Sequence, residues 1–115
     1  MAELDLVLLD SRDGAARACW MPDGRFLNGN RVVQGGFIAA VCDQMLAAAL
    51  LSVVPEQTFS SINLNTTFHR AVLPGAYEVS ATVVRQGRRT AYVEAEVRQD
   101  GLLFASSNGS FMLMD

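Results

Sequence analysis

The residues best suited to chemistry lie within one apolar run, "VVQGGFIAAVCDQMLAAALL" at residues 32–51. Gly35 and Gly36 stand where an apolar helix would begin, and the free backbone N–H groups of a helix N-terminus favour an anion. Asp43 lies two turns further on, where an unpartnered buried carboxylate is costly. A carboxylate in that position can act as a nucleophile or as the base that activates water. It can also be a structural acid bonded to backbone or to an arginine.

Periodicity and turn signals predict the elements that position these residues. Residues 4–9 and 15–20 read as two short strands joined at Asp13-Gly14, and the apolar helix runs from Gly35 to about Val54, where Pro55 stops it. Beyond Pro55 the hydrophobic period changes to two, which is typical of strands. Four strands are expected at 60–70, 76–86, 89–99 and 102–113, with a bulge at Asn108-Gly109 in the last.

These elements predict one domain over residues 1–115, an α+β fold in which a curved antiparallel sheet wraps one long helix. One helix cannot cover so many long strands completely, and such a sheet has open edges that another chain can pair with. Both features favour an oligomer.

Composition and charge exclude several other classes of protein. A net charge of −3 argues against a nucleic-acid partner, whose phosphates need a basic surface. Cys19 and Cys42 have no metal-type spacing and are expected to be reduced thiols of a cytoplasmic protein, whose acidic N-terminus lacks the start of a signal peptide. Residues 37–54 are long enough to span a membrane, but a central carboxylate costs about 2.5–3.5 kcal/mol there. A helix buried on nearly every side explains the run better.

The pattern resembles the hot-dog fold, and more narrowly the phenylacetate-pathway type of acyl-CoA thioesterase. The resemblance rests on Asn28, "QGGFIAAVCD", "NLNTTFHRAVLPG", "TVVRQGRR", "VEAEVRQDG" and the final strand, in this order. The motif of that family is His-Gly-Gly with an acid nine residues after the His. Here Gln34 occupies the His position and Asp43 the acid position. Glutamine donates and accepts hydrogen bonds, but it cannot titrate.

The resemblance implies a role for each matching residue. Asp43 would be the base or nucleophile, and the Gly35 N–H would stabilise the oxyanion of the thioester. Asn28, six residues before the motif, and Ser61, eighteen after the acid, would complete the catalytic group, with Ser61 orienting water. Substrate contacts are expected from Gly36, from Arg88 on the coenzyme A phosphates, and from Phe68 in the acyl pocket. His69, the only histidine, is expected at the surface or at an interface.

Spacing then predicts how the site is assembled. Gly35 and Asp43 are eight residues apart, which is about 12 Å along a helix. They cannot both touch one thioester carbonyl, but two antiparallel helices side by side would bring Gly35 of one chain near Asp43 of the other. The sequence therefore predicts a homodimer or a dimer of dimers with shared sites, as the resemblance also implies.

The leading prediction is an acyl-CoA thioesterase that releases a carboxylic acid and free coenzyme A without a metal or redox cofactor. A hot-dog protein that binds acyl-CoA without turnover is an alternative, and Gln34 is the residue that favours it. A hot-dog dehydratase is a third possibility, although that chemistry usually requires a histidine together with the acid.

Overall fold

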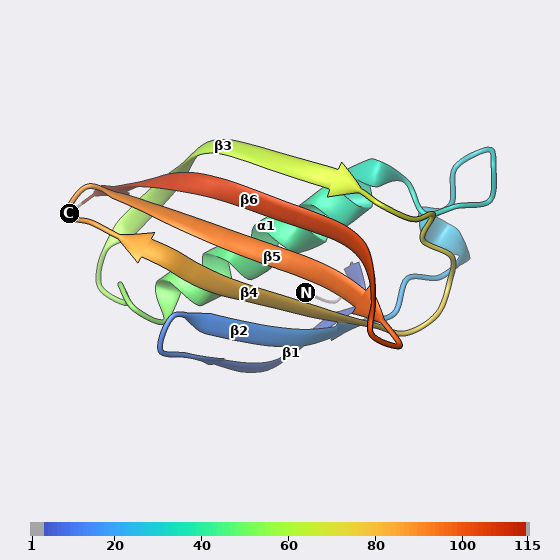
Figure 1. The fold of residues 1–115 in the computed structure, drawn as a ribbon, viewed down its shortest axis with the longest axis horizontal. Coiled ribbons are helices and arrows are strands. Elements are labelled where there is room, and N and C mark those ends of the chain that lie inside the picture. Colours follow the sequence, from blue (N-terminus) through green and yellow to red (C-terminus); the bar gives the residue numbers. More distant parts are fainter. Residues whose placement is uncertain (1–3, 115) are drawn as a thin grey trace.

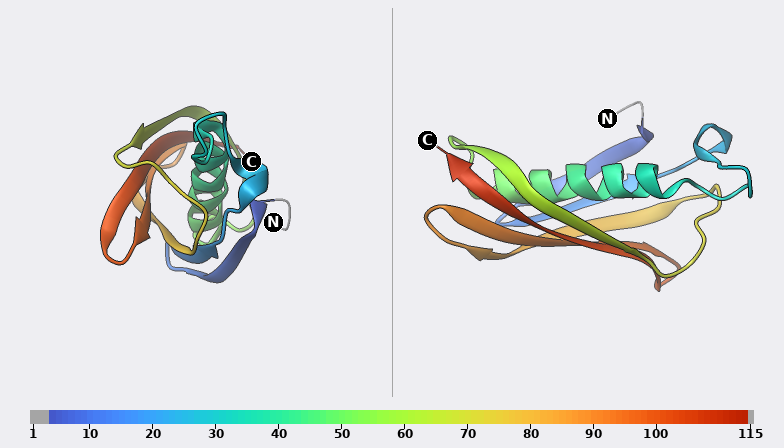
Figure 2. Two further views of the ribbon diagram at one scale, coloured as in Figure 1. Left: turned by 90° about the vertical axis from the view of Figure 1, so that its right-hand side faces the viewer. Right: turned by 90° about the horizontal axis from the view of Figure 1, so that it is seen from above.

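The computed structural model describes residues 4–114 of the predicted domain, so residues 1–3 and 115 lie outside the described residues. The six strands form one antiparallel sheet in the order β1-β2-β4-β5-β6-β3, which curves around a single long helix (Figures 1 and 2). The predicted α+β architecture is confirmed. In chain order the elements are β1 (Leu6–Arg12), β2 (Ala15–Trp20), the short 3-10 helix η2 (Gly24–Phe26), α1 (Gly35–Leu51), β3 (Thr58–Phe68), β4 (Tyr77–Gln86), β5 (Thr90–Gln99) and β6 (Leu102–Met114).

The two Asp-Gly turns have the backbone that the sequence predicts. Asp13 and Gly14 have φ of 54° and 81°, and Asp100 and Gly101 have φ of 53° and 79°. Positive φ at both central residues matches the right-handed twist of the flanking strands. The first hairpin is also tied to the end of the helix, because the Gly14 N–H donates to Ser52 Oγ at 2.8 Å.

The helix buries one face in the concave side of the sheet and leaves the other open. Its buried residues recur at helical spacing and pack mainly against β2, β4, β5 and β6. The opposite face carries Gly36, Ala40, Asp43 and Ala47, which are half-buried or exposed. The prediction of a helix buried on nearly every side is therefore wrong, because small residues look apolar in the sequence without being covered in the fold. The buried residues are Ile38, Val41, Cys42, Met45, Leu46, Ala49 and Leu50.

The predicted boundaries of the helix, of β1 and of β3 shift, and β3 begins and ends two residues before the predicted 60–70. The helix ends at Leu51 instead of near Val54, because the backbone N–H groups of Val53 and Val54 both turn back to the Leu50 carbonyl. The residue before a proline also avoids the helical conformation, which ends the helix before Pro55. Strand β1 begins and ends later than the predicted 4–9. Within residues 4–114, no helix combines the length and apolar character that crossing a membrane requires.

Strand β3 is the outer strand on one side of the sheet. It pairs with β6 along one edge, and its other edge has no partner within the described chain. Apolar side chains remain exposed on it, including Ile62 at 51%, Leu64 at 37% and Phe68 at 52%. An unpaired strand with exposed apolar residues is a surface that a second chain can cover.

Strand β3 has a bulge, whereas β6 has none at Asn108-Gly109, where that pair predicts one; the extra residue of β6 against β5 lies at Phe104 instead. The β3–β6 register shifts between Ser61 and Asn63, while Gly109 keeps regular pairing with Leu64. Gly109 has a packing role instead. A Cβ atom at this position would lie 2.9 Å from the Asn63 carbonyl oxygen and 3.2 Å from Leu46 Cδ1. Glycine is thus required where the helix and β3 both approach β6.

We expect Gly109→Ala to lower the free energy of unfolding by about 1–3 kcal/mol, the usual cost of forcing extra atoms into a packed site. Gly24→Ala is the matched control, because nothing lies within 4 Å of a Cβ at that position. Urea denaturation of both variants measures the difference. Equal stability of the two variants would show that β3 and Leu46 can move away from Gly109 without cost.

Candidate active site

The N-terminus of α1 is open and has no capping side chain. Gln34 precedes the helix with an extended backbone, and its carbonyl oxygen accepts from the N–H groups of Phe37 at 3.0 Å and Ile38 at 3.3 Å. The N–H groups of Gly35 and Gly36 donate to no acceptor in residues 4–114. The first turn contains no acidic side chain. The positive end of the helix dipole is therefore available to an external acceptor.

Gln34 itself does not reach the open amides. Its side chain is exposed, and Nε2 lies 3.4 Å from the Leu27 carbonyl oxygen, which it contacts as a weak donor. This contact joins the start of the helix to the preceding loop. Gln34, which occupies the motif's histidine position, therefore supports the backbone next to the site through this contact.

Asn28 organises the loop that leads into the helix. Its Oδ1 accepts from the N–H groups of Asn30 at 2.8 Å and Val32 at 3.3 Å. Its own N–H donates to the Val32 carbonyl oxygen at 2.8 Å, and Arg31 adopts a positive φ of 62°. These bonds close a tight loop over residues 28–32, so the predicted site residue has a structural role in holding this loop.

The structure brings three predicted residues together at the helix N-terminus. Asn28, Gly35 and Phe68 line one cavity of about 420 Å³. Ile38, His69 and Arg70 line it too, and the sequence analysis did not predict them there. Their signal was available, because His69 and Arg70 directly follow Phe68 and Ile38 lies one turn after Gly35. His69 is exposed, as predicted, and its Nε2 is hydrogen-bonded to Ser106 Oγ at 2.9 Å.

Asp43 lies on the open face of the helix, beside the buried Cys42. One turn after Cys42, Leu46 approaches Gly109 on β6. Because successive helical residues turn by about 100°, Asp43 projects away from the sheet-facing side that carries Cys42 and Leu46. Its carboxylate is half-buried and makes no ion pair or hydrogen bond with residues 4–114. The alternative of a structural acid would require a backbone or arginine partner.

Cys42, the neighbour of Asp43, is not a candidate nucleophile. Burial raises the pKa of its thiol to about 12, with a smaller upward contribution from the Asp43 charge and an opposing one from the Ser107 hydrogen bond. A thiol attacks as the thiolate, which is scarce near neutrality at such a pKa. Of the two adjacent side chains, Asp43 alone can therefore serve as a base or nucleophile.

Ser61 lies on the helix-facing side of β3. It pairs with Phe111, whose side chain is in the core, while Leu64 pairs with the buried Gly109. Simple alternation predicts Ser61 on the face opposite Leu64 and Phe68. The bulge at Ile62 adds one residue between them and returns Ser61 to the concave side. Ser61 thus faces the concave side of the sheet, the side on which α1 lies.

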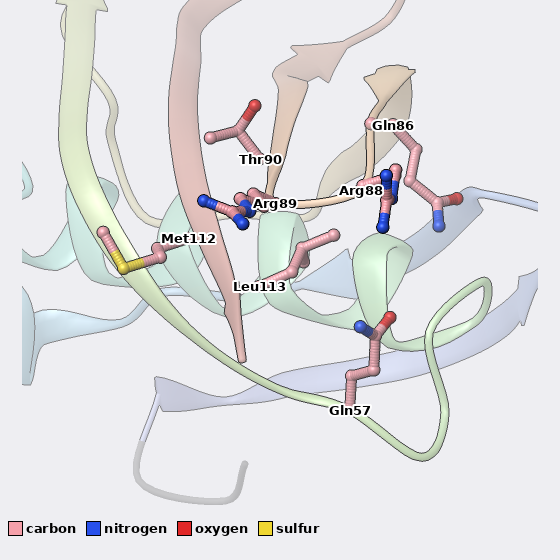
Figure 3. A pocket seen from close by; sticks show the side chains of 8 residues that line it. Gln57, Gln86, Arg88, Arg89, Thr90, Met112 and Leu113 are labelled. Atoms are coloured by element: carbon pink, nitrogen blue, oxygen red, sulfur yellow. The ribbon is translucent and has the colours of Figure 1, made fainter. Parts of the chain in front are cut away.

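The turn between β4 and β5 lies at the end of the protomer opposite the start of α1 (Figure 1), and Arg88 is in this turn. It belongs to the turn between β4 and β5 and lines a cavity of about 860 Å³. Figure 3 shows Arg88 facing the side of Gln57, while Arg89 extends towards Met112 on β6. A single protomer therefore does not bring Arg88 together with the open helix N-terminus. Among the described residues, no group of three His, Cys, Asp or Glu side chains is placed to hold a metal ion.

Residues 30–104, about two thirds of the chain, match the thioesterase superfamily, so the chain belongs to this superfamily and is a thioester hydrolase. The predicted hot-dog family is confirmed, and the binding-only and dehydratase alternatives lose their support. None of the curated proteins shows significant sequence similarity to the chain.

Three solved structures are similar to the chain over nearly its whole length. A phenylacetic acid degradation-related protein of Ralstonia eutropha is 29% identical, with a TM-score of 0.89 over 96% of this chain and 86% of its own. A conserved protein of Pseudomonas aeruginosa is 27% identical, with a TM-score of 0.93 over 98% and 91%. A variant of the phenylacetic acid degradation protein PaaI of Thermus thermophilus is 26% identical, with a TM-score of 0.90 over 97% and 96%.

Proposed function

We propose that this enzyme hydrolyses acyl-CoA thioesters in active sites shared between the two protomers of a homodimer. The observation that carries the proposal is the pairing, on one open helix face, of free N–H groups at Gly35 and an unpartnered carboxylate at Asp43. One group can stabilise a developing oxyanion and the other can deliver the nucleophile. Membership of the thioesterase superfamily supports this assignment of roles.

The Gly35 N–H is the proposed oxyanion donor. As the thioester carbonyl is attacked, negative charge builds on its oxygen, and a preorganised donor there lowers the barrier. A helix N-terminus with no cap has its donor already oriented, so no reorganisation is needed during the reaction. Gly36, which is exposed and has nothing within 4 Å of its side-chain position, lets substrate approach the backbone closely.

Asp43 is the proposed base or nucleophile. As a base it would take a proton from water while the water oxygen attacks the carbonyl carbon, and collapse of the tetrahedral intermediate would expel the coenzyme A thiolate. As a nucleophile its carboxylate would attack the carbonyl carbon and expel the coenzyme A thiolate, leaving an anhydride that water then hydrolyses to the free acid and the Asp43 carboxylate. Ser61, on the concave side of β3, would orient the water in either route, and Asn28 and Gln34 would hold the loop and helix start that present Gly35.

The unpaired edge of β3 supports the dimer. Pairing two β3 edges about a two-fold axis would join the sheets and place the two α1 helices antiparallel on one concave surface. The exposed Leu64 and the small residues Ala40 and Ala47 would then face the partner. Gly35 of one protomer would approach Asp43 of the other, which the spacing of about 12 Å within one helix prevents. A dimer of dimers would contain the same shared sites.

The same antiparallel arrangement assigns Arg88 to a site. The Arg88 end of one protomer would lie beside the helix N-terminus of its partner. Coenzyme A could then extend from the Gly35 site of one protomer into the Arg88 cavity of the other, where Arg88 would pair with its phosphates. The acyl group would occupy the cavity beside Phe68.

We expect Asp43→Asn to reduce turnover by at least ~10²-fold, the lower end of the contribution of a positioned base. Acyl-CoA binding and the melting temperature should change little, because Asp43 has no partner to lose. Asp100→Asn is the control, because aspartate and asparagine both suit the first central position of the β5–β6 turn. Thiol release, isothermal titration and thermal melts measure the three properties. Full activity in a folded Asp43→Asn protein would end the assignment.

We expect Arg88→Ala to raise KM about 10- to 100-fold with a smaller effect on kcat, because a charge-assisted hydrogen bond contributes about 1.5–3 kcal/mol and acts equally in ground and transition states. Arg17→Ala is the control. It removes a different exposed arginine, which lies on β2, and should leave KM and kcat unchanged. Steady-state kinetics with an acyl-CoA measures the effect. An unchanged KM in Arg88→Ala would mean that Arg88 is only a solvated side chain.

A further inference from the structure

The ring of Phe68 lies directly over the first residue of α1. A Cβ atom at Gly35 would be 2.9 Å from Phe68 Cζ, 3.3 Å from Cε2 and 3.4 Å from Cε1. These three atoms form the outer edge of the ring. The glycine at position 35 therefore leaves just enough space for this edge, and the ring borders the place where an acceptor must bind the Gly35 N–H.

The core does not hold this ring in place. Phe68 is 52% exposed and is absent from the cluster of buried apolar residues in residues 4–114. Phe68 is the last residue of the outer strand β3, and it pairs with the small Ala105 on β6. By contrast, Phe59 on the same strand packs against the core residue Phe111, with ring centroids 5.6 Å apart and an interplanar angle of 88°. The packing of the core therefore does not depend on a phenyl ring at position 68.

We propose that Phe68 determines specificity by restricting the site to acyl groups that are unbranched at the α-carbon. This inference rests on the proposed function of the Gly35 N–H. A carbonyl oxygen that accepts from this N–H lies about 2.9 Å from the nitrogen, so the α-carbon of the acyl group is held within a few ångströms of the ring edge. A CH2 group can pass flat along an aromatic edge. An additional methyl group at the α-carbon would need room beside the same ring edge, which leaves too little space even for one added carbon at Gly35.

The remaining cavity is consistent with this restriction. Beyond the ring edge, Val33, Ile38 and Val72 provide an apolar wall, and all three are buried. An acyl chain that extends past the ring therefore contacts apolar surface, which favours long acyl chains over branched ones. Phe68 is the member of this wall that side-chain substitution can remove without opening the core.

The test compares pairs of substrates that differ only by a methyl group or its position at the α-carbon. Butyryl-CoA and isobutyryl-CoA are isomers, and phenylacetyl-CoA and 2-phenylpropanoyl-CoA form an aromatic pair. We expect the wild-type enzyme to prefer the unbranched member by at least about tenfold in kcat/KM, the lower end of what one misplaced carbon causes in a fitted pocket. Phe68→Leu should reduce this preference about tenfold, mainly by raising kcat/KM for the branched member.

Phe59→Leu is the matched control, with the same substitution on the same strand but at a half-buried position that packs against the core. It should lower the melting temperature and keep the substrate preference. A preference that is unchanged in Phe68→Leu, or absent in the wild type, would overturn the role of Phe68 while leaving thioester hydrolysis established. A wild-type enzyme that hydrolyses none of the four acyl-CoA thioesters would contradict the proposed acyl-CoA hydrolysis itself.

Discussion

The fixed spacing of Gly35 and Asp43 along α1 is the constraint on which the rest of the arrangement depends. A helix is rigid on this scale, so the two groups remain about 12 Å apart whatever the loops do. In the proposed mechanism one thioester carbonyl needs both an oxyanion donor and a nucleophile within about 3 Å, so a single protomer would carry two half-sites. The uncapped helix start and the carboxylate without a partner are both understandable as groups whose partners lie in another chain or in the substrate.

The same constraint gives a reason for features that would otherwise weaken a monomer. The open helix face consists of glycine and alanine beside Asp43, which sacrifices apolar burial but permits a second helix to approach closely. Strand β3 exposes Leu64 and an unpaired edge, both of which are liabilities in an isolated sheet. Gly109 lets β3 and Leu46 approach β6 closely, and the bulge at Ile62 returns Ser61 to the concave side. These features all lie on α1, on β3 or on the neighbouring strand β6.

The sequence predicts the local elements well because their signals are local. Glycines at the helix start, Asp-Gly turns and alternating strand residues each depend on a few neighbouring positions. Properties that depend on distant pairing were missed. The extra residues lie at Ile62 in β3 and at Phe104 in β6, although Asn108-Gly109 carries the turn-like residues, because the register between strands decides where an extra residue falls. The open face of α1 was missed because alanine is apolar whether or not it is covered. The Phe68 ring contacts Gly35, which is 33 positions away in the sequence, and periodicity does not predict a contact between such distant residues.

Hybrid dimers test the shared site most directly. Asp43→Asn removes the carboxylate, and Gly35→Pro removes the N–H at the first helical position, where the backbone tolerates proline. Both changes are made in a Phe68→Ala background, because a Cβ at position 35 would otherwise lie 2.9 Å from Phe68 Cζ. Each variant alone should be inactive. When equal amounts are unfolded and refolded together, half of the dimers should be hybrids with one intact site of two, so about a quarter of the activity of the Phe68→Ala parent should return. If differently tagged subunits show that hybrids form and the mixture stays inactive, each site is built within one protomer and the account is wrong.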